Sequence, residues 1–128
     1  MPKILFGVSP IGLGHATRDI VIVEELRRQG AEVMLFSGGK AADFIREQGY
    51  TVEDIVDDPV PSVSNGEMRR VALWYIRSWF AYKRTLKRTE RLFDGYAPDL
   101  VVGDEEFTGM GVADKRGKKY RFIENRRV

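Results

Sequence analysis

The chain has 128 residues, no cysteine and a formal net charge of +2. Its hydrophobic share of 43% and charged share of 31% are those of a globular protein with a sizeable core, and they exclude a disordered or fibrous chain. Without cysteine there can be no disulfide and no cysteine-based metal site, which suits a reducing compartment. The apolar run 4–8 is too short for a signal peptide, and no other stretch has the length to span a bilayer, so we expect a cytoplasmic protein.

The first half of the chain alternates between strand and helix patterns. Short apolar runs predict buried strands, and apolar residues three or four positions apart predict helices between them. Gly30 and Gly49 stand where the two helices should end. The expected elements are a strand at 4–8, a helix at 15–29, a strand at 32–36, a helix at 40–48 and a strand at 51–56.

The second half begins with residues 57–64, which hold two prolines and no periodicity and therefore predict a loop. A long amphipathic pattern follows, and the Asp-Gly-Tyr-Ala-Pro stretch at 94–98 is expected to end that helix. The expected elements are a helix at 67–93, a strand at 99–103, a helix at 109–116 and a strand at 120–123.

This alternation predicts an α/β protein with right-handed parallel crossovers. We expect a Rossmann-like, doubly wound parallel sheet of about five strands in the order 3-2-1-4-5, with helices on both faces in three layers. Ligands of such sheets bind beyond the carboxyl ends of the strands, where the strand order reverses. The reversal lies between the first and fourth strands, so His15 and Asp104 should meet there.

The loop after the first strand carries Gly12 and Gly14, which expose backbone N–H groups at the start of a helix and so predict an anion site. A dinucleotide fingerprint needs a third glycine, but Thr17 occupies that position. It also needs an acidic residue after the second strand, where this chain has Ser-Gly-Gly at 37–39. Receiver domains and aspartyl phosphatases need carboxylates where this chain has Ser-Pro at 9–10. These three protein classes are therefore disfavoured.

His15 is the only histidine of the chain. A histidine at a helix start can simply cap the helix or bond to a neighbour, but the loop at the reversal of strand order is where function concentrates. A carboxylate such as Asp104 would fix the imidazole tautomer and leave the other ring nitrogen to deprotonate a bound hydroxyl. The pair therefore indicates activation of an alcohol nucleophile.

Several stretches of this sequence are similar to one known family. They are Gly-Leu-Gly-His-Ala-Thr-Arg at 12–18, Glu-Leu at 25–26, Gln-Gly-Ala-Glu-Val at 29–33, Phe-Ser-Gly-Gly at 36–39 and Pro-Asp-Leu-Val-Val-Gly-Asp at 98–104. Together they resemble the N-terminal domain of GT-B glycosyltransferases in the UDP-glycosyltransferase superfamily. The resemblance is closest to the family-28-like branch, which includes the lipid-linked N-acetylglucosaminyl transferase of cell-wall synthesis, and it covers nearly the whole chain.

The resemblance implies an enzyme that transfers a hexosyl group from a nucleotide-diphospho-sugar to the hydroxyl of an acceptor, a small molecule or a lipid-linked one. It assigns His15 as the base and Asp104 as the residue that holds it, and it calls for no cofactor and no metal. Arg18 stands where many members have proline, and we expect it to touch a phosphate or to pair with Glu105 or Glu106. The acceptor- or phosphate-binding residues implied are Gly12, Gly14, Thr17, Arg18 and Glu105.

Enzymes of this family have two Rossmann-like domains, and the C-terminal one holds the nucleotide-sugar. This chain ends just after the fifth expected strand, so we expect residues 1–128 to be one acceptor-binding domain that is inactive by itself. An open edge at the last strand favours self-association. Two alternatives remain open, namely a non-catalytic module that binds anions or lipids, and a sugar-nucleotide epimerase of the same architecture.

The long helix expected at 67–93 combines cations with aromatic residues. It has three interpretations: a solvated helix whose aromatics pack on the sheet, a surface for anionic lipid headgroups at the membrane periphery, or a nucleic-acid site. No RNA- or DNA-binding motif accompanies the charge, so we expect no nucleic-acid partner. The residues expected on this surface are Arg70, Arg77, Arg84, Arg88 and Trp79, with Arg91, Trp74, Tyr75, Phe80 and Tyr82 around them.

Overall fold

The computed structural model of the chain describes residues 1–10, 13–56, 68–104 and 108–123. These residues form a parallel sheet with the strand order β3-β2-β1-β4-β5. The strands are β1 (Lys3–Val8), β2 (Glu32–Ser37), β3 (Val52–Asp54), β4 (Leu100–Asp104) and β5 (Lys119–Ile123). The helices are α1 (Leu13–Arg28), α2 (Gly39–Glu47), α3 (Met68–Tyr96) and α4 (Thr108–Lys115). The predicted doubly wound α/β fold and its strand order are confirmed.

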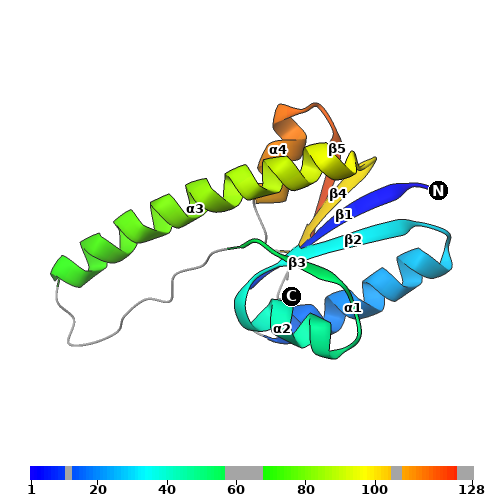
Figure 1. Cartoon of the computed structure of the whole chain (residues 1–128), viewed down its shortest axis with the longest axis horizontal. Helices are drawn as coiled ribbons and strands as arrows, with labels where there is room; N and C mark the ends of the chain where they lie inside the picture. Colours follow the sequence, from blue (N-terminus) through cyan, green and yellow to red (C-terminus); the bar gives the residue numbers. More distant parts are fainter. Residues whose placement is uncertain (11–12, 57–67, 105–107, 124–128) are drawn as a thin grey trace, which may run out of the picture.

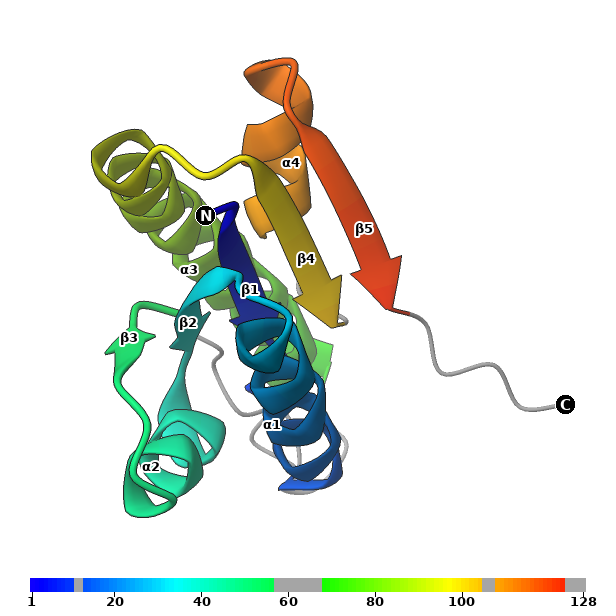
Figure 2. The same ribbon diagram turned by 90° about the vertical axis from the view of Figure 1, so that its right-hand side faces the viewer.

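The helices cover both faces of the sheet, with α1 and α2 on one side and α3 and α4 on the other (Figures 1 and 2). Alternate residues of β1 face opposite sides of the sheet. Ile4 and Phe6 pack on the side of α1 and α2, and Leu5 packs on the side of α3 and α4. Burial of each such side chain stabilises the fold by about 1.5–3 kcal/mol. Because both faces are covered, the central strands are continuous apolar runs, which is the pattern that identified them.

The register between β1 and β4 brings the two carboxyl ends of these strands level. Val8 lies opposite Asp104, and the Ser9 N–H donates to the Asp104 carbonyl oxygen at 3.1 Å. Ser9, the residue after β1, therefore lies beside Asp104. This is the point at which the strand order reverses.

Most predicted element bounds lie within one or two residues of the structure, and two of the differences have a clear cause. The strand expected at 51–56 pairs only over β3, because the N–H groups of Ile55 and Val56 both donate to the Ser37 carbonyl and so end the ladder. The helix expected to stop at 93 continues as α3 to Tyr96 and ends where Ala97 takes a positive φ of 52°. The loop predicted at 57–64 lies outside the described residues.

Local packing explains the first glycine of the Ser-Gly-Gly stretch after β2. A methyl group on Gly38 would lie 2.0 Å from the Val56 carbonyl oxygen, so the backbones approach too closely for any side chain. Gly39, the first residue of α2, has a φ of +56° that suits glycine. These glycines are therefore required by the turn between β2 and α2.

Only part of α3 packs against the rest of the protein. Its second half buries Ala81, Thr85, Thr89 and Phe93, whereas its first half projects beyond the body (Figure 1). The Thr89 hydroxyl also lies 3.0 Å from the hydroxyl of Thr108, the first residue of α4. α3 is thus joined to the start of the helix that follows β4.

Candidate functional site

Four ionisable side chains meet at the carboxyl ends of β1 and β4, and we call them the switch-point cluster: His15, Arg18, Asp19 and Asp104. The first three come from the beginning of α1, at positions i, i+3 and i+4, which lie on one face of a helix. The fourth is the last residue of β4. The topology therefore brings together residues that are far apart in the sequence.

Asp104 is the centre of the cluster and is fully buried. One of its carboxylate oxygens, Oδ2, lies 3.2 Å from Nδ1 of His15. The other, Oδ1, accepts a hydrogen bond of 2.7 Å from Nη2 of Arg18. His15 and Arg18 are partly exposed, with side-chain exposures of 21% and 37%. The cluster thus has a buried anion with two partners that reach the surface.

This geometry selects one tautomer of the His15 ring. Nδ1 faces a carboxylate oxygen and therefore carries the proton of the neutral ring, which makes Nε2 the nitrogen with an accepting lone pair. Nη2 of Arg18 lies 3.5 Å from the same Nδ1, but two donors do not bond to each other at that distance. In the neutral ring, the accepting nitrogen is therefore the one that does not face Asp104.

The two carboxyl groups of the cluster differ in protonation. Burial alone would raise the pKa of Asp104, but the adjacent Asp19, the hydrogen bond and charge of Arg18, and the contact with His15 together lower that pKa. Burial and the adjacent Asp104 together raise the pKa of Asp19 to about 9, and the Arg18 charge offsets them only in part. At neutral pH, Asp104 is therefore an anion and Asp19 a neutral acid.

Sequence reasoning placed His15, Arg18 and Asp104 near the reversal point but missed Asp19. Arg18 pairs with Asp104, which neither of its two expected roles included. Glu105 and Glu106, its other expected partners, lie outside the described residues. The available signal for Asp19 was its spacing of four positions from His15, which puts both on one helix face.

The remaining residues expected to bind acceptor or phosphate lie at the start of α1. Gly14 is exposed in the first turn, and a methyl group there would meet none of the described residues within 4 Å. Thr17 is exposed one turn further along. Gly12 lies outside the described residues.

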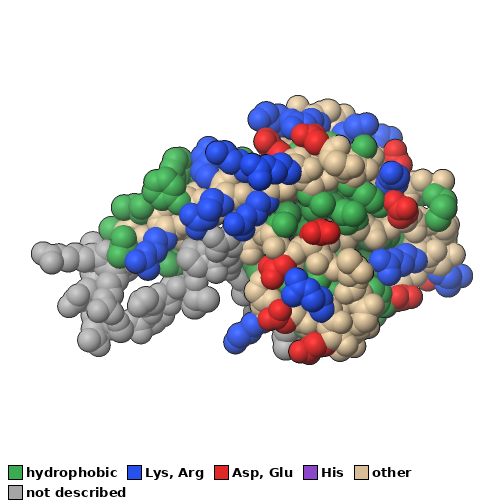
Figure 3. Space-filling view, in the orientation of Figure 1, with side chains coloured by type: hydrophobic (Ala, Val, Ile, Leu, Met, Phe, Trp, Pro, Cys, Tyr) green, Lys and Arg blue, Asp and Glu red, His purple; other side chains and the backbone are tan. Residues whose placement is uncertain are grey.

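The first half of α3 exposes most of its large apolar side chains, which argues against the interpretation that they pack on the sheet. Trp79 is 56% exposed, and the Lys83 ammonium lies 5.4 Å from the centre of its ring. Figure 3 shows cations gathered over α3 and apolar side chains toward its projecting end. The exposed apolar residues are Leu73, Tyr75, Ile76, Trp79, Phe80 and Tyr82.

The expected cations of α3 include one that bonds to the end of β3. Arg77, Arg84 and Arg88 are all exposed, but Arg88 donates to the Ile55 carbonyl at 3.3 Å and so contacts the end of β3. The side chain of Arg70 lies outside what the structure describes. Over the described ranges, no helix combines the length and apolar character needed to cross a bilayer.

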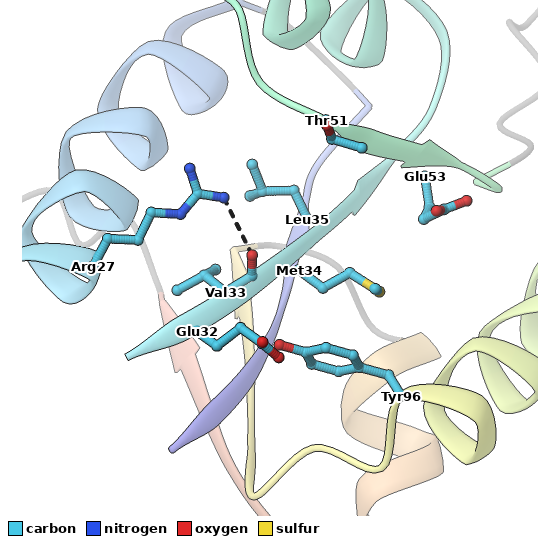
Figure 4. Close-up of a pocket in the computed structure, with 8 residues that line it drawn as sticks. All are labelled: Arg27, Glu32, Val33, Met34, Leu35, Thr51, Glu53 and Tyr96. Carbon is cyan, nitrogen blue, oxygen red and sulfur yellow. Dashed lines mark hydrogen bonds between the residues drawn. The ribbon is translucent and has the colours of Figure 1, made fainter. Parts of the chain in front are cut away.

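A pocket of about 250 Å³ lies at the opposite end of the sheet from the cluster. It is formed by the start of β2 and the ends of α1 and α3 (Figure 4). In it, the Tyr96 ring points toward Glu32, and Arg27 donates to the Val33 carbonyl at 3.2 Å. Because parallel sheets bind ligands at the carboxyl ends of their strands, we place the candidate site at the cluster and not in this pocket. No group of three or more potential metal ligands occurs among the described residues.

The fold agrees with what comparison with known proteins shows. A family model described as glycosyl transferase family 1 matches residues 2–127. The chain belongs to glycosyl transferase family 1. A protein of Methanosarcina mazei described as an uncharacterized glycosyltransferase is 29% identical over 129 residues, which cover 94% of this chain and 32% of that protein. The chain thus spans about a third of the length of its curated relative.

Solved glycosyltransferase structures share the fold of this family 1 chain. The calicheamicin glycosyltransferase CalG4 has a TM-score of 0.68 at 24% identity, with 95% of this chain and 32% of CalG4 covered. MurG of Acinetobacter baumannii has a TM-score of 0.66 at 15% identity, with 94% of this chain and 33% of MurG covered. The Streptomyces glycosyltransferase SsfS6, complexed with thymidine diphosphate, has a TM-score of 0.63 at 17% identity, with 95% of this chain and 38% of SsfS6 covered. The expected resemblance to GT-B glycosyltransferases is confirmed.

Proposed function

We propose that this chain is the acceptor-binding domain of a glycosyltransferase that moves a hexosyl group from a nucleotide-diphospho-sugar to an acceptor hydroxyl. Membership of glycosyl transferase family 1 supports the reaction class. The contact of 3.2 Å between His15 Nδ1 and the buried Asp104 carboxylate is the observation that carries the assignment of the base. It leaves Nε2 of a partly exposed imidazole as the proton acceptor.

In the proposed reaction, Nε2 of His15 takes the proton of the acceptor hydroxyl as its oxygen attacks the anomeric carbon of the donor. The new carbon–oxygen bond forms while the bond from that carbon to the diphosphate breaks, and the nucleoside diphosphate leaves with the electron pair. The resulting imidazolium is stabilised by the Asp104 carboxylate on its other nitrogen. Base catalysis of this kind typically contributes about 10²–10⁴-fold to the rate.

The donor is held, in this proposal, by a second domain. The chain spans 32% of its curated relative and 38% of SsfS6, so most of each relative lies outside the matched region. SsfS6 is complexed with thymidine diphosphate, which supports a nucleotide diphosphate donor for this chain. Residues 1–128 would then supply the acceptor site and the base, and would show no transfer alone.

The start of α1 is the proposed place for the acceptor or the donor diphosphate. Packing against the described residues does not require glycine at position 14, which supports a role in letting a ligand approach the backbone. Backbone N–H groups in the first turn of a helix favour an anion at that position. Exposed Thr17 offers a hydroxyl one turn away, and Gly12 and Glu105 remain proposed contacts on the sequence pattern alone.

For α3 we propose a contact with anionic lipid headgroups at a membrane surface. Exposed apolar side chains at its projecting end lie next to a row of cations, which is the combination that peripheral membrane helices use. The residues proposed for this contact are Arg70, Arg77, Arg84, Arg88 and Trp79. A lipid-linked acceptor would be reached from such a surface. The same face would also serve a binding module without catalysis, and the base therefore needs its own test.

The test of the base uses the protein in which this chain is joined to a donor-binding domain. Release of nucleoside diphosphate from UDP- and dTDP-sugars is measured for the wild type, for His15→Ala and for Glu47→Gln, an exposed control on α2. We expect His15→Ala to lose about 10²–10⁴-fold in rate and the control to lose nothing. Turnover of His15→Ala at the wild-type rate would show that His15 is not the base.

A further inference from the structure

Asp19 is buried without the partners that a carboxylate needs. Its side chain is 1% exposed, and within the described part of the chain neither of its oxygens accepts a hydrogen bond from a donor. The nearest cationic atom is Nε of Arg18 at 3.8 Å, and that guanidinium already binds Asp104 through Nη2. A solvated surface aspartate would show none of these features.

A buried carboxylate without donors is costly, and the usual resolution is that the group takes up a proton. A neutral carboxyl group gains a donor of its own, because its O–H can bond to an acceptor. The acceptor beside Asp19 is Asp104, whose carboxylate has lone pairs beyond the two used by His15 and Arg18. If the two adjacent carboxyl groups share one proton, Asp19 and Asp104 each gain a hydrogen-bond partner.

We propose that Asp19 is a positioning residue that stays protonated and donates its proton in a hydrogen bond to Asp104, which thereby holds His15 in its neutral, base-competent form. The inference rests on the proposed function for its catalytic meaning. The hydrogen bond itself is a property of the folded chain and can be measured without turnover.

The charges that face Asp19 explain why its protonation matters. They come from His15 and Arg18 on α1 and from Asp104 on β4. The Arg18 cation and the Asp104 anion balance each other, so an ionised Asp19 would add an uncompensated negative charge beside the imidazole. That charge would favour the imidazolium, which cannot accept a proton. A neutral Asp19 leaves His15 free to act as a base.

The experiment is a pH titration of the 128-residue chain by NMR, with the wild type, Asp19→Asn and Asp19→Ala. Because His15 is the only histidine, its ring signals need no assignment by mutation. The wild-type Asp19 carboxyl ¹³C signal should stay in its protonated position through neutral pH. Asn keeps a neutral donor toward Asp104, so its His15 titration should coincide with that of the wild type. Ala removes the donor, and the His15 titration should move to higher pH.

Two results would overturn the inference. One is an Asp19 carboxyl that ionises near the ordinary aspartate value of about 4. The other is a His15 titration that moves as far in Asp19→Asn as in Asp19→Ala. If Asp19→Ala does not fold, the wild-type carboxyl signal and the Asn variant decide the question. Loss of nucleotide-sugar turnover in His15→Ala is a separate result, so failure of either proposal is recognised independently of the other.

Discussion

The switch-point cluster and α3 both concentrate charge, but they hold it in opposite ways. In the cluster, Asp104 and Asp19 are buried, and each charged group faces an identified neighbour at a defined distance. On α3, exposed cations such as Arg77, Lys83 and Arg84 share the helix with exposed apolar side chains. The switch-point cluster consists of a few specific contacts, whereas α3 presents many similar exposed side chains.

The difference predicts how each region responds to change. The stability of buried, paired charges depends on individual side chains and on pH, because removal of one partner leaves the other charge buried without an opposite charge beside it. Exposed charges act through their sum, so one substitution has a small effect and salt weakens all of them together. The following experiments test this contrast, from the largest expected effect to the smallest.

The largest effect is expected for Asp104→Ala in the protein with its donor-binding domain. Loss of the carboxylate removes the 3.2 Å contact with His15 Nδ1 and the 2.7 Å hydrogen bond from Arg18. We expect the transfer rate to fall by about 10³-fold or more and the free energy of unfolding to fall by about 1.5–3 kcal/mol. Nucleoside diphosphate release and urea unfolding measure these quantities. A full transfer rate would remove Asp104 from the proposed mechanism.

A second experiment contrasts tight and open packing. Gly38→Ala places a methyl group 2.0 Å from the Val56 carbonyl oxygen, so the backbone must move and the free energy of unfolding should fall by about 1–3 kcal/mol. Leu73→Ala in the exposed half of α3 should change it by less than about 0.5 kcal/mol. Gly111→Ala, where the methyl group meets nothing within 4 Å, controls for the loss of a glycine. Equal effects at Gly38 and Leu73 would contradict the contrast.

The third prediction concerns pH and Asp19→Asn. The pKa of Asp19 is raised in the folded state, so between about pH 4 and 9 the folded chain keeps a proton that the unfolded chain releases. The wild type should therefore lose stability relative to Asp19→Asn as pH rises through this window, by at most ~1.4 kcal/mol per pH unit.

Thermal unfolding at several pH values measures the difference between wild type and Asp19→Asn. The lowered pKa of Asp104 acts in the other direction, because the stability it contributes is lost only as pH falls below about 4. It therefore does not obscure the window in which Asp19 acts. Parallel stability curves for the two proteins from pH 5 to 8 would mean that Asp19 is ionised in both states.

The smallest effect per residue is expected on α3. Binding to phosphatidylserine vesicles should weaken by about fivefold for each cation removed, so the triple variant Arg77→Gln, Arg84→Gln, Lys87→Gln is compared with the wild type. Arg88 is kept because it bonds to Ile55. The control removes the same charge elsewhere, at Lys40, Lys118 and Lys119.

Tryptophan fluorescence reports the α3 contact directly, since both tryptophans of the chain, Trp74 and Trp79, lie in the first half of this helix. A blue shift is expected with anionic vesicles, and it should disappear at high salt. Equal binding to neutral vesicles, or equal loss in the control variant, would rule out the proposed headgroup contact.

Most of the fold could be predicted because its signals are local. Apolar runs between helical patterns identify buried parallel strands, and the rule for reversed strand order then places His15 beside Asp104. Asp19 and the Arg18–Asp104 pair could not be predicted in the same way. A buried aspartate in a helix looks like a surface one until the position of the opposite strand is known. The short β3 likewise depends on a carbonyl, that of Ser37, which accepts two N–H groups.

The proportions of α3 have a mechanical consequence. A helix of 29 residues is about 43 Å long, whereas a strand of six residues extends about 20 Å. One part of the helix therefore projects from the body, and the other part contacts α4 through the hydroxyl groups of Thr89 and Thr108. That contact is the point at which a force on the projecting part of α3 would reach the start of α4.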